Sequence, residues 1–468
     1  MIKLTRFLAI AAVTFINLEA FAWDGRSSDI SWFSNAQNEY HISNAEQLKG
    51  LSDLVLVGNT FEDKTIILDN DIDLGYSSWQ PIGGNTYGSG YFNGIFDGQN
   101  HKITSVHPVL NTNSSYPLLS YGLFGNTGDK SIIKNLTVTG GAEIAPGAST
   151  SELCAGGIVG SSNGSVENVQ TNFNISASDK SYNDVQSLYV GGVCGRGNNV
   201  TNAKSSGKIA LAYANVQWRI GNQGGIGGIA GRGGNINKVE SACNISAWGK
   251  NMTAVGGIVG EGLDCTVENA MFCGSLSIQQ DIFYNPSAFL TACSGIVGRS
   301  INTLSVSNCI SAPSSYNVTI SAIYLAPIAG DSQSKDWTGS NNYYTLPPTA
   351  SDNLGQVITE NKLCSGDPLN GFDSNVWDFK ANKLPSIKNV GVGEVTSIKN
   401  IENVNRTDFL INNNKIIFPN IKAKTIIEVY SIDGKKVYSG YINSNEPILL
   451  NKGTYIIKIG KSKIKIAI

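Results

Sequence analysis

The sequence predicts an all-β protein, in which a parallel right-handed β-helix (a solenoid) with an N-terminal helical cap precedes a small C-terminal β-sandwich. Three observations predict this fold class. A glycine-rich string recurs at intervals of about 35 residues, a period typical of a solenoid or a propeller. Short apolar segments alternate with Gly, Asn and Ser turns, and no convincing helix interrupts them. Only 15% of the 468 residues are charged and 52 are glycine, which suits a long β structure with many tight turns.

The recurring string reads G-G-I-V-G or a close variant of it. It occurs at residues 121–125, 156–160, 191–195, 227–231, 256–260, 294–298 and 326–330. If each repeat forms one coil, like positions stack about 4.8 Å apart along the solenoid axis. We then expect the central Ile and Val residues to form an internal aliphatic ladder, and the glycines to provide corner conformations and close contact between coils. A propeller is the alternative, although about 35 residues is short for a four-stranded blade.

An asparagine follows five of these strings at a distance of seven to ten residues. Stacked at one corner of the coils, such side chains can form a ladder of amide hydrogen bonds. The fourth repeat has Lys238 at this position, with Asn237 one step earlier. The predicted structural ladder consists of Asn135, Asn168, Asn202, Asn269 and Asn308.

The most glycine-dense run, residues 221–234, contains G-x-G-x-x-A at Gly225, Gly227 and Ala230. This spacing is a permitted form of the dinucleotide-binding fingerprint, which also needs a following helix and an acidic residue about 20 positions further on. A turn and another strand follow instead, and Glu240 comes too early. We therefore predict no cofactor and assign these glycines to corners and coil stacking.

The first 22 residues have the pattern of a secretory signal peptide. Lys3 and Arg6 precede an apolar run, and Ala20 and Ala22 form an A-x-A cleavage site. No later segment approaches about 20 apolar residues, so we expect an exported protein with no transmembrane helix in the mature chain.

A helical cap is predicted at the start of the mature chain. Ser43 and Glu46 have the spacing of a capping box, and apolar residues follow at helical intervals, at positions 48, 51, 54 and 55. The predicted boundaries are 1–22 for the signal peptide, 23–92 for the cap and first coil, 93–345 for the β-solenoid, 346–393 for a C-terminal cap or linker and 394–468 for the last module.

The charge is unevenly distributed along the chain. From Glu394 onward there are twelve Lys and Arg residues and six Asp and Glu residues, a net charge of +6. The whole chain carries −2, so the part before Glu394 carries about −8. This asymmetry indicates a separate C-terminal module. Its basic residues alternate with apolar ones, which favours a solvated strand face over a nucleic-acid-binding surface.

Several segments carry a family resemblance. They are "YHISNAEQLKGLSDLV", "FEDKTIILDNDIDLG" and "WQPIGG", followed by the G-G-I-V-G coils. With these segments, residues from about 23 to 390 resemble the GLUG-repeat proteins of bacterial cell surfaces, and the resemblance implies a surface or adhesive role. Such repeats also occur beside the catalytic part of IgA-cleaving metallopeptidases, but this chain has no H-E-x-x-H motif.

The last module carries a second resemblance. The segments "IIEVYSIDGKKVYSG", "ILLNKGTYIIKIG" and "SKIKIAI" are similar to the type A sorting domain of the type IX secretion system. Asp433-Gly434 has the composition of a hairpin turn. The resemblance implies a small β-sandwich, recognised by an outer-membrane translocon and often removed when the cargo is attached to surface lipopolysaccharide. It also implies a host of the Bacteroidetes type.

Acidic residues offer two weak candidates for chemistry. Asp69, Asp71 and Asp73 have the D-x-D-x-D spacing of a calcium loop, but the sixth position lacks glycine and the twelfth lacks glutamate, so an alternating strand is the preferred interpretation. A glycosidase needs two facing carboxylates. Glu167 and Glu268 share a repeat position but lie too many coils apart, so no catalytic residue is predicted. The eight cysteines show no zinc-ligand spacing, and small buried thiols are expected.

Aromatic residues recur 12 to 14 positions before the closing glycine of five strings. They are Tyr182, Trp218, Trp248, Tyr284 and Tyr316. Stacked coils would bring them into a row that could bind sugar rings or a partner protein. Packing beneath the variable loops is the other interpretation, and it is the preferred one.

These observations predict an exported, non-enzymatic adhesin or ligand-binding solenoid, with a glycan or a host surface protein as ligand and the type IX translocon as a partner of the last module. A polysaccharide-processing β-helix enzyme, lyase or glycosidase, is the alternative. A structural surface stalk is the third interpretation.

Overall fold

The structure is a computed structural model that describes residues 23–84, 90–110, 118–145, 151–177, 187–212, 223–249, 254–280, 291–319, 323–332, 336–345, 354–391, 410–412, 415–417, 425–431, 436–442, 447–450, 454–459 and 462–467. The chain divides into two compact units, Met1–Gly393 and Glu394–Ile468. The division falls where the charge of the sequence changes sign.

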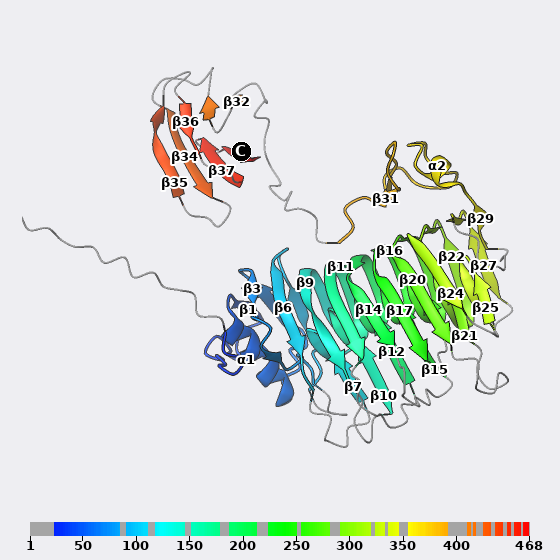
Figure 1. Ribbon diagram of the computed structural model, residues 1–468. Helices are drawn as coiled ribbons and strands as arrows, with labels where there is room; N and C mark the ends of the chain where they lie inside the picture. The colour runs from blue at the N-terminus through cyan, green and yellow to red at the C-terminus, as the bar shows by residue number, and fades with distance from the viewer. Residues whose placement is uncertain are drawn as a thin grey trace, which may run out of the picture. The chain divides into compact units, whose positions relative to one another are not determined.

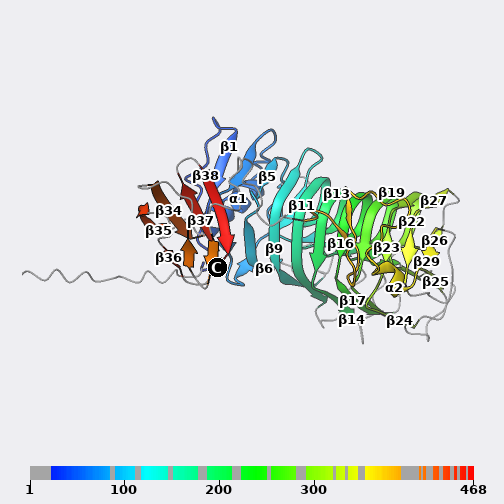
Figure 2. The ribbon, with the colours of Figure 1, turned by 90° about the horizontal axis from the view of Figure 1, so that it is seen from above.

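The first unit is a parallel β-solenoid. Its coils stack along one axis, and equivalent strands of successive coils pair in parallel (Figures 1 and 2). A seven-stranded sheet contains β7 (Leu118–Tyr121), β10 (Glu152–Ala155), β12 (Ser187–Gly191), β15 (Gln223–Gly227), β18 (Ala254–Gly256), β21 (Thr291–Ser294) and β25 (Ile323–Ala326).

A 22-stranded sheet forms the other walls of the coils. Its first strands are β1 (Glu39–Ile42), β2 (Thr65–Leu68), β3 (Ile72–Asp73), β4 (Ser78–Trp79), β5 (Ile95–Asp97), β6 (Lys102–Pro108), β8 (Phe124–Thr127), β9 (Ile132–Ile144), β11 (Val159–Ala177), β13 (Cys194–Ser206) and β14 (Lys208–Ala212). The later strands are β16 (Ala230–Ser241), β17 (Asn244–Gly249), β19 (Val259–Phe272), β20 (Ser275–Gln280), β22 (Val297–Ser307), β23 (Ile310–Ser311), β24 (Ser315–Thr319), β26 (Ala329–Ser332), β27 (Trp337–Ser340), β28 (Tyr343–Tyr344) and β29 (Gln356–Val357).

Helix α1 (Ala45–Leu56) begins the solenoid at its N-terminal end. Its N-cap is Asn44, whose side chain accepts a hydrogen bond from the Gln47 N–H at 2.9 Å. The N-cap therefore lies one position after the predicted Ser43. Asn44 and Gln47 form the capping pair that the sequence predicts for Ser43 and Glu46. The helix buries Leu48, Leu51, Leu54 and Val55 against the first coil, as their helical spacing predicts.

The interior of the coils is an aliphatic ladder. The central residue of each glycine string points inward and is fully buried, and the backbone groups of neighbouring strings are hydrogen-bonded, as between the Val193 N–H and the Ile229 carbonyl at 3.0 Å. The predicted ladder of Ile and Val is confirmed. Its members are Ile158, Val193, Ile229, Ile258, Ile296 and Ile328.

The glycines of the strings serve close packing and not corner conformations. None of the nine glycines in the strings at 156–160, 191–195 and 227–231 has a positive φ. A Cβ atom at Gly156 would lie 2.5 Å from the Val159 carbonyl oxygen and 2.6 Å from the Val193 carbonyl oxygen of the next coil. The prediction that these glycines provide corner conformations is therefore wrong. The prediction that they allow close contact between coils is confirmed. The strings turn so tightly that no side chain fits between neighbouring backbones.

The corners are formed by asparagine. Asn135, Asn168, Asn202, Asn269 and Asn308 all have φ between 50° and 57°, the left-handed region that asparagine tolerates better than most residues. Asn168 Nδ2 donates to Asn135 Oδ1 at 2.7 Å, and Asn202 Nδ2 donates to Asn168 Oδ1 at 2.9 Å.

The ladder changes register in the fourth repeat. Lys238 takes the left-handed corner there, with φ of 53°, while the amide oxygen of Asn237 accepts from Asn269 at 3.2 Å. Asn341, a position that the repeat pattern had not included, donates to Asn308 at 3.1 Å.

Residues 354–391, which we call the strap, follow the last coils and return along the outside of the solenoid. They begin with β29, which pairs with β28, and then contain α2 (Glu360–Leu363), β30 (Trp377–Asp378) and β31 (Ser386–Ile387). The strap buries Trp377 and Phe372 in one cluster with Met271 and Ile310 of the coils. Its polar contacts reach successive coils, because Trp377 Nε1 donates to Asn269, the Ile387 N–H donates to Glu240 and the Gly391 N–H donates to the Asn202 carbonyl.

The second unit is a pair of small antiparallel sheets. One contains β32 (Leu410–Asn412), β33 (Lys415–Ile417) and β36 (Pro447–Leu449), and the other contains β34 (Thr425–Ser431), β35 (Lys436–Ile442), β37 (Thr454–Ile459) and β38 (Ser462–Ala467). Hydrogen bonds from Lys436 and Lys458 lower the pKa of Glu428 to about 2. The predicted Asp433-Gly434 turn lies outside the described residues.

Replacing Gly228 with alanine is expected to destabilise the solenoid by about 1–3 kcal/mol. The added methyl group would overlap the Ser241 hydroxyl and the Gly257 carbonyl of the next coil. Thermal unfolding of the mature chain measures the effect. Gly84→Ala is the matched control, because its nearest neighbour would be Leu56 Cδ1 at 3.6 Å, an ordinary contact. Equal loss of stability in both variants would contradict the packing role.

Candidate functional site

A column of polar residues runs along the solenoid at the position immediately after each closing glycine. Its members pair in register from coil to coil, and we call them the polar spine. They are Asn126, Ser161, Arg196, Arg232, Glu261 and Arg299. The tight glycine turn places a second column, from the seven-stranded sheet, opposite the spine. This facing column includes Ser120, Cys154, Tyr189 and Gly225.

In the later coils the spine is filled by large charged side chains. The Glu261 carboxylate is fully buried, and Arg299 Nε donates to its Oε2 at 3.0 Å. Arg232 Nε lies 3.7 Å from Oε1, and the Tyr189 hydroxyl donates to the same oxygen at 3.2 Å. Gly225 leaves room opposite Glu261, because a Cβ atom there would lie 3.1 Å from the Glu261 Cβ. Each guanidinium thus has its counter-charge within one or two coils.

Tyr189 separates two like charges of the spine. The Arg196 and Arg232 guanidinium carbons lie 5.9 Å and 5.5 Å from the centre of its ring, so both make cation–π contacts. The Tyr189 hydroxyl accepts from Arg232 Nη1 at 3.2 Å. Burial is the main cause that raises the pKa of Tyr189 well above its usual range, so the phenol stays neutral.

Arg196 is the last guanidinium of the spine, and its side chain is 35% exposed. Its Nη1 donates to Glu152 Oε1 at 2.7 Å. Burial opposes the charge of Arg196, yet Glu152, together with Cys154 and Tyr189, raises the pKa of the guanidinium. Glu152 and the Tyr189 ring together hold the orientation of this side chain.

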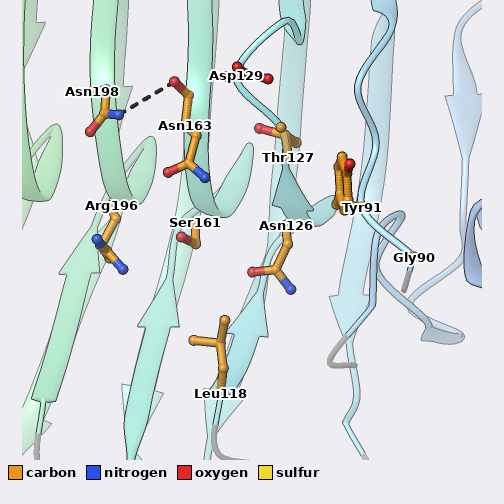
Figure 3. A pocket seen from close by; sticks show the side chains of 11 residues that line it. Gly90, Tyr91, Leu118, Asn126, Thr127, Asp129, Ser161, Asn163, Arg196 and Asn198 are labelled. Carbon is orange, nitrogen blue, oxygen red and sulfur yellow. Dashed lines mark hydrogen bonds between the residues drawn. The ribbon is translucent and has the colours of Figure 1, made fainter. Parts of the chain in front are cut away.

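A groove opens where the large side chains end. Beyond Arg196 the spine continues with Ser161 and Asn126, and the facing column with Cys154 and Ser120, all of them small. The groove has a volume of about 620 Å³ (Figure 3). It is lined by Gly90, Tyr91, Leu118, Asn126, Thr127, Gly128, Asp129, Ser161, Asn163, Arg196 and Asn198.

The groove combines a rigid floor with an exposed rim. Asn126 is held on the floor, since its Nδ2 donates to the Gly84 carbonyl at 2.8 Å and its Oδ1 accepts from Ser120 at 2.8 Å. The Tyr91 ring is 40% exposed at one end. Asn163 and Asn198 are exposed on neighbouring coils, and Asn198 Nδ2 donates to the Asn163 carbonyl at 3.4 Å. A flat ring beside several amides is an arrangement suited to sugars.

The sequence interpretation missed this groove, although a signal for it exists. The residue after each closing glycine is polar in every coil from Asn126 to Arg299. Along this column of the sequence, the residues change from small to bulky and charged between Ser161 and Arg196. The groove also needs Tyr91, which precedes the repeats and cannot be placed from their period.

The predicted aromatic row is largely outside the described residues. Tyr182, Trp218 and Tyr284 lie there, as does the side chain of Trp248. Tyr316 is described, and it packs against the core with its hydroxyl 3.8 Å from Cys293 Sγ. Burial raises the pKa of Tyr316 well above its usual range. Its register partner is Leu276, whereas that of Trp248 is Gln279, so these two positions do not share a column.

The three aspartates of the weak calcium candidate, Asp69, Asp71 and Asp73, each contact a different partner. Asp69 Oδ1 lies 2.8 Å from His41 Nδ1, and Asp71 Oδ1 lies 2.9 Å from His101 Nδ1. The hydrogen bond to the Asp69 carboxylate is the main cause that raises the pKa of His41. Asp73 accepts from the Gly75 N–H at 3.0 Å. Among the described residues, no three acidic, histidine or cysteine side chains gather as metal ligands would.

The acidic pair that the repeats place at one position is widely separated. Glu167 and Glu268 belong to one register column with Thr201 and Asn237 between them. Three coil steps separate the two carboxyl-bearing residues by about 14 Å along the axis. Neither of the two helices in the described part of the chain is long and apolar enough to cross a membrane.

Replacing Glu261 with glutamine is expected to destabilise the solenoid by about 3–5 kcal/mol, because it removes the buried negative charge between Arg232 and Arg299. Chemical unfolding of the mature chain measures the change. Glu268→Gln, in a half-buried outer column, is the control and should stay within about 0.5 kcal/mol of the parent. A small effect at Glu261 would show that the spine contributes little to stability.

Comparison with known proteins gives distant similarities. No family model matches the chain. A segment of 134 residues is 29% identical to a protein of Evansella cellulosilytica named "Putative Gly-rich membrane protein". The matched segment is 28% of this chain and 14% of that protein, so the chain spans about a seventh of its length. The structure is also similar to the crystal structure of "a putative immunoglobulin A1 protease from Bacteroides ovatus", at 18% identity and a TM-score of 0.42, over 76% of this chain and 94% of that one.

Proposed function

We propose that this protein is an exported, surface-attached or secreted adhesin of the ligand-binding kind, and that its groove binds a glycan without transforming it. The observation that carries the proposal is the groove of about 620 Å³ with the exposed Tyr91 ring at one end and Arg196 at the other. An exposed aromatic ring offers a flat apolar platform to a sugar face. The amides of Asn163 and Asn198 offer both donors and acceptors to sugar hydroxyls.

The backbone around the groove supports recognition of a defined shape. Its walls come from successive coils, in β8, β11 and β13, which pair in register. The floor side chains are hydrogen-bonded to neighbouring coils, as Thr127 is to Ser162 at 3.0 Å. A site on paired strands loses little conformational freedom on binding, which favours affinity.

The composition of the lining supports binding over hydrolysis. Among the described residues that line the groove, Asp129 is the single carboxylate. Hydrolysis of a glycosidic bond commonly uses two carboxylates on opposite sides of the sugar. We therefore place the adhesin before the polysaccharide-processing enzyme, and before a stalk that would need no groove.

The two ends of the chain support export. We propose that residues 1–22 act as a signal peptide and that the second unit acts as a type IX sorting domain, with the outer-membrane translocon as its partner. The proposal rests on the resemblance of its sequence. The compact form of the unit and its basic strand β38, which carries Lys463 and Lys465, are compatible with it. GLUG-type surface display would then place the groove outside the cell.

Replacing Tyr91 with alanine is expected to weaken glycan binding about tenfold, because the stacking platform is lost. The measurement is a glycan array with the full mature chain, followed by calorimetry on the best ligand. Tyr76→Ala is the matched control, since Tyr76 is 66% exposed and does not line the groove. Equal binding by the parent and Tyr91→Ala would sink the proposed site, and absence of any glycan ligand would sink the function.

Removing residues 394–468 is expected to keep the solenoid inside a Bacteroidetes-type cell. The measurement is antibody labelling of whole cells that express the full or the shortened chain. Lysates should contain the shortened chain in comparable amount, because the first unit has its own core. Equal surface labelling of the two forms would contradict the sorting role.

A further inference from the structure

Opposite charges alternate along the polar spine from Asp331 to Arg232, and Arg196, the next member at the groove, breaks the alternation. Arg232, Glu261 and Arg299 are successive register partners, with the carboxylate in the middle. Asp331 is the register partner of Arg299 on the far side. At the groove end, the partners of Arg196 are Arg232 on one side and Ser161 on the other. The row therefore lacks an acidic group at the Ser161 position, where the groove offers space.

From this pattern we infer that the groove recognises the carboxylate of an acidic sugar, and that Arg196 binds it above Ser161. The inference rests on the proposed function and adds the chemical class of the ligand. A carboxylate at that position would lie one coil from Arg196, as Glu261 lies one coil from Arg299, whose Nε–H donates to it at 3.0 Å. The ligand would complete the row of charges.

Arg196 is organised for this role before any ligand arrives. One of its five N–H groups donates to Glu152, and its guanidinium carbon lies 5.9 Å from the centre of the Tyr189 ring. The side chain is neither buried nor free in solution, since 35% of it is exposed at the groove wall. A guanidinium held in this way matches the two oxygens of a carboxylate and loses little rotamer entropy on binding.

The opposite end of the groove sets the orientation of the sugar. Asp129 lies two coil steps from Arg196, or about 10 Å along the axis. Figure 3 shows Arg196 on one side of Ser161 and Asp129 and Tyr91 on the other. The charge of Asp129 repels a ligand carboxylate, so the acidic group points to Arg196 and an uncharged ring face lies on Tyr91. A chain with a negative charge on every sugar residue would place charge beside Asp129 as well, which favours a ligand in which the sugar at Tyr91 is uncharged.

The test uses a panel of uronic-acid and sialic-acid oligosaccharides, each paired with its methyl ester, and a sulfated oligosaccharide as a separate arm. The full mature chain is expected to bind at least one acidic member about tenfold more tightly than its ester, the size of one charge-assisted hydrogen bond. Arg196→Gln should abolish that preference. Arg26→Gln removes an exposed charge outside the groove and should retain it.

A second variant guards against a folding defect in Arg196→Gln. Ser161→Asp supplies the missing acidic group from the protein, so it should suppress binding of the acidic sugars while preserving or raising the unfolding temperature. The inference is overturned if no acid is preferred over its ester, if the preference survives both substitutions, or if the sulfated arm binds more tightly than every carboxylate. Glycan binding that depends on Tyr91 but ignores the carboxylate would overturn this inference alone and leave the proposed function standing.

Discussion

The spacing of about 4.8 Å between paired strands is the constraint on which the rest of this structure depends. Every inward residue must fit against the residue at the same position in the next coil. The space between them is smallest at the glycine strings. A Cβ atom at Gly157 would lie 2.9 Å from the Gly192 carbonyl oxygen of the next coil and 3.0 Å from the Phe173 Cβ across the interior. Because only hydrogen fits there, the chain can reverse sharply, and the two strands that flank the turn bring their outer side chains face to face.

This tight reversal creates the polar spine and, with it, the groove. Tyr189 and Arg196 are seven residues apart, yet they are in contact because the turn between them is so narrow. The paired strands repeat the same register from coil to coil, so side-chain size decides whether the space beside the turn is filled. Arginine, glutamate and tyrosine fill it in the later coils, and Ser161 and Asn126 leave it open in the earlier ones. A binding site thus arises from a change of side-chain volume within an otherwise regular column.

The repeat period alone predicts most of the first unit, because stacking turns sequence periodicity directly into register. The aliphatic ladder follows from it. The position of the helix and its buried face follow instead from the capping-box spacing and the helical intervals of its apolar residues. Three features did not follow. The glycines were assigned to corners as well as to contacts, but asparagine bears the left-handed φ at the corners and Lys238 shows that the position accepts another residue. Asn44 replaced Ser43 as the N-cap, since two capping pairs overlap there. The repeat period does not predict the groove, because the groove depends on which residues face each other across a turn. A period describes only which residues stack.

The strap gives the solenoid a property that stacked coils do not have by themselves. In a repeat array each coil contacts its immediate neighbours, so coils can separate one at a time from an end. The strap binds Asn269, Glu240 and Asn202, which belong to successive coils, and the second unit follows it in the sequence. A pulling force on the chain at that junction therefore acts on the middle coils, through Gly391 and Ile387, before it acts on the last coil. The force is therefore shared among several coils, and the last coil does not separate from the solenoid by itself.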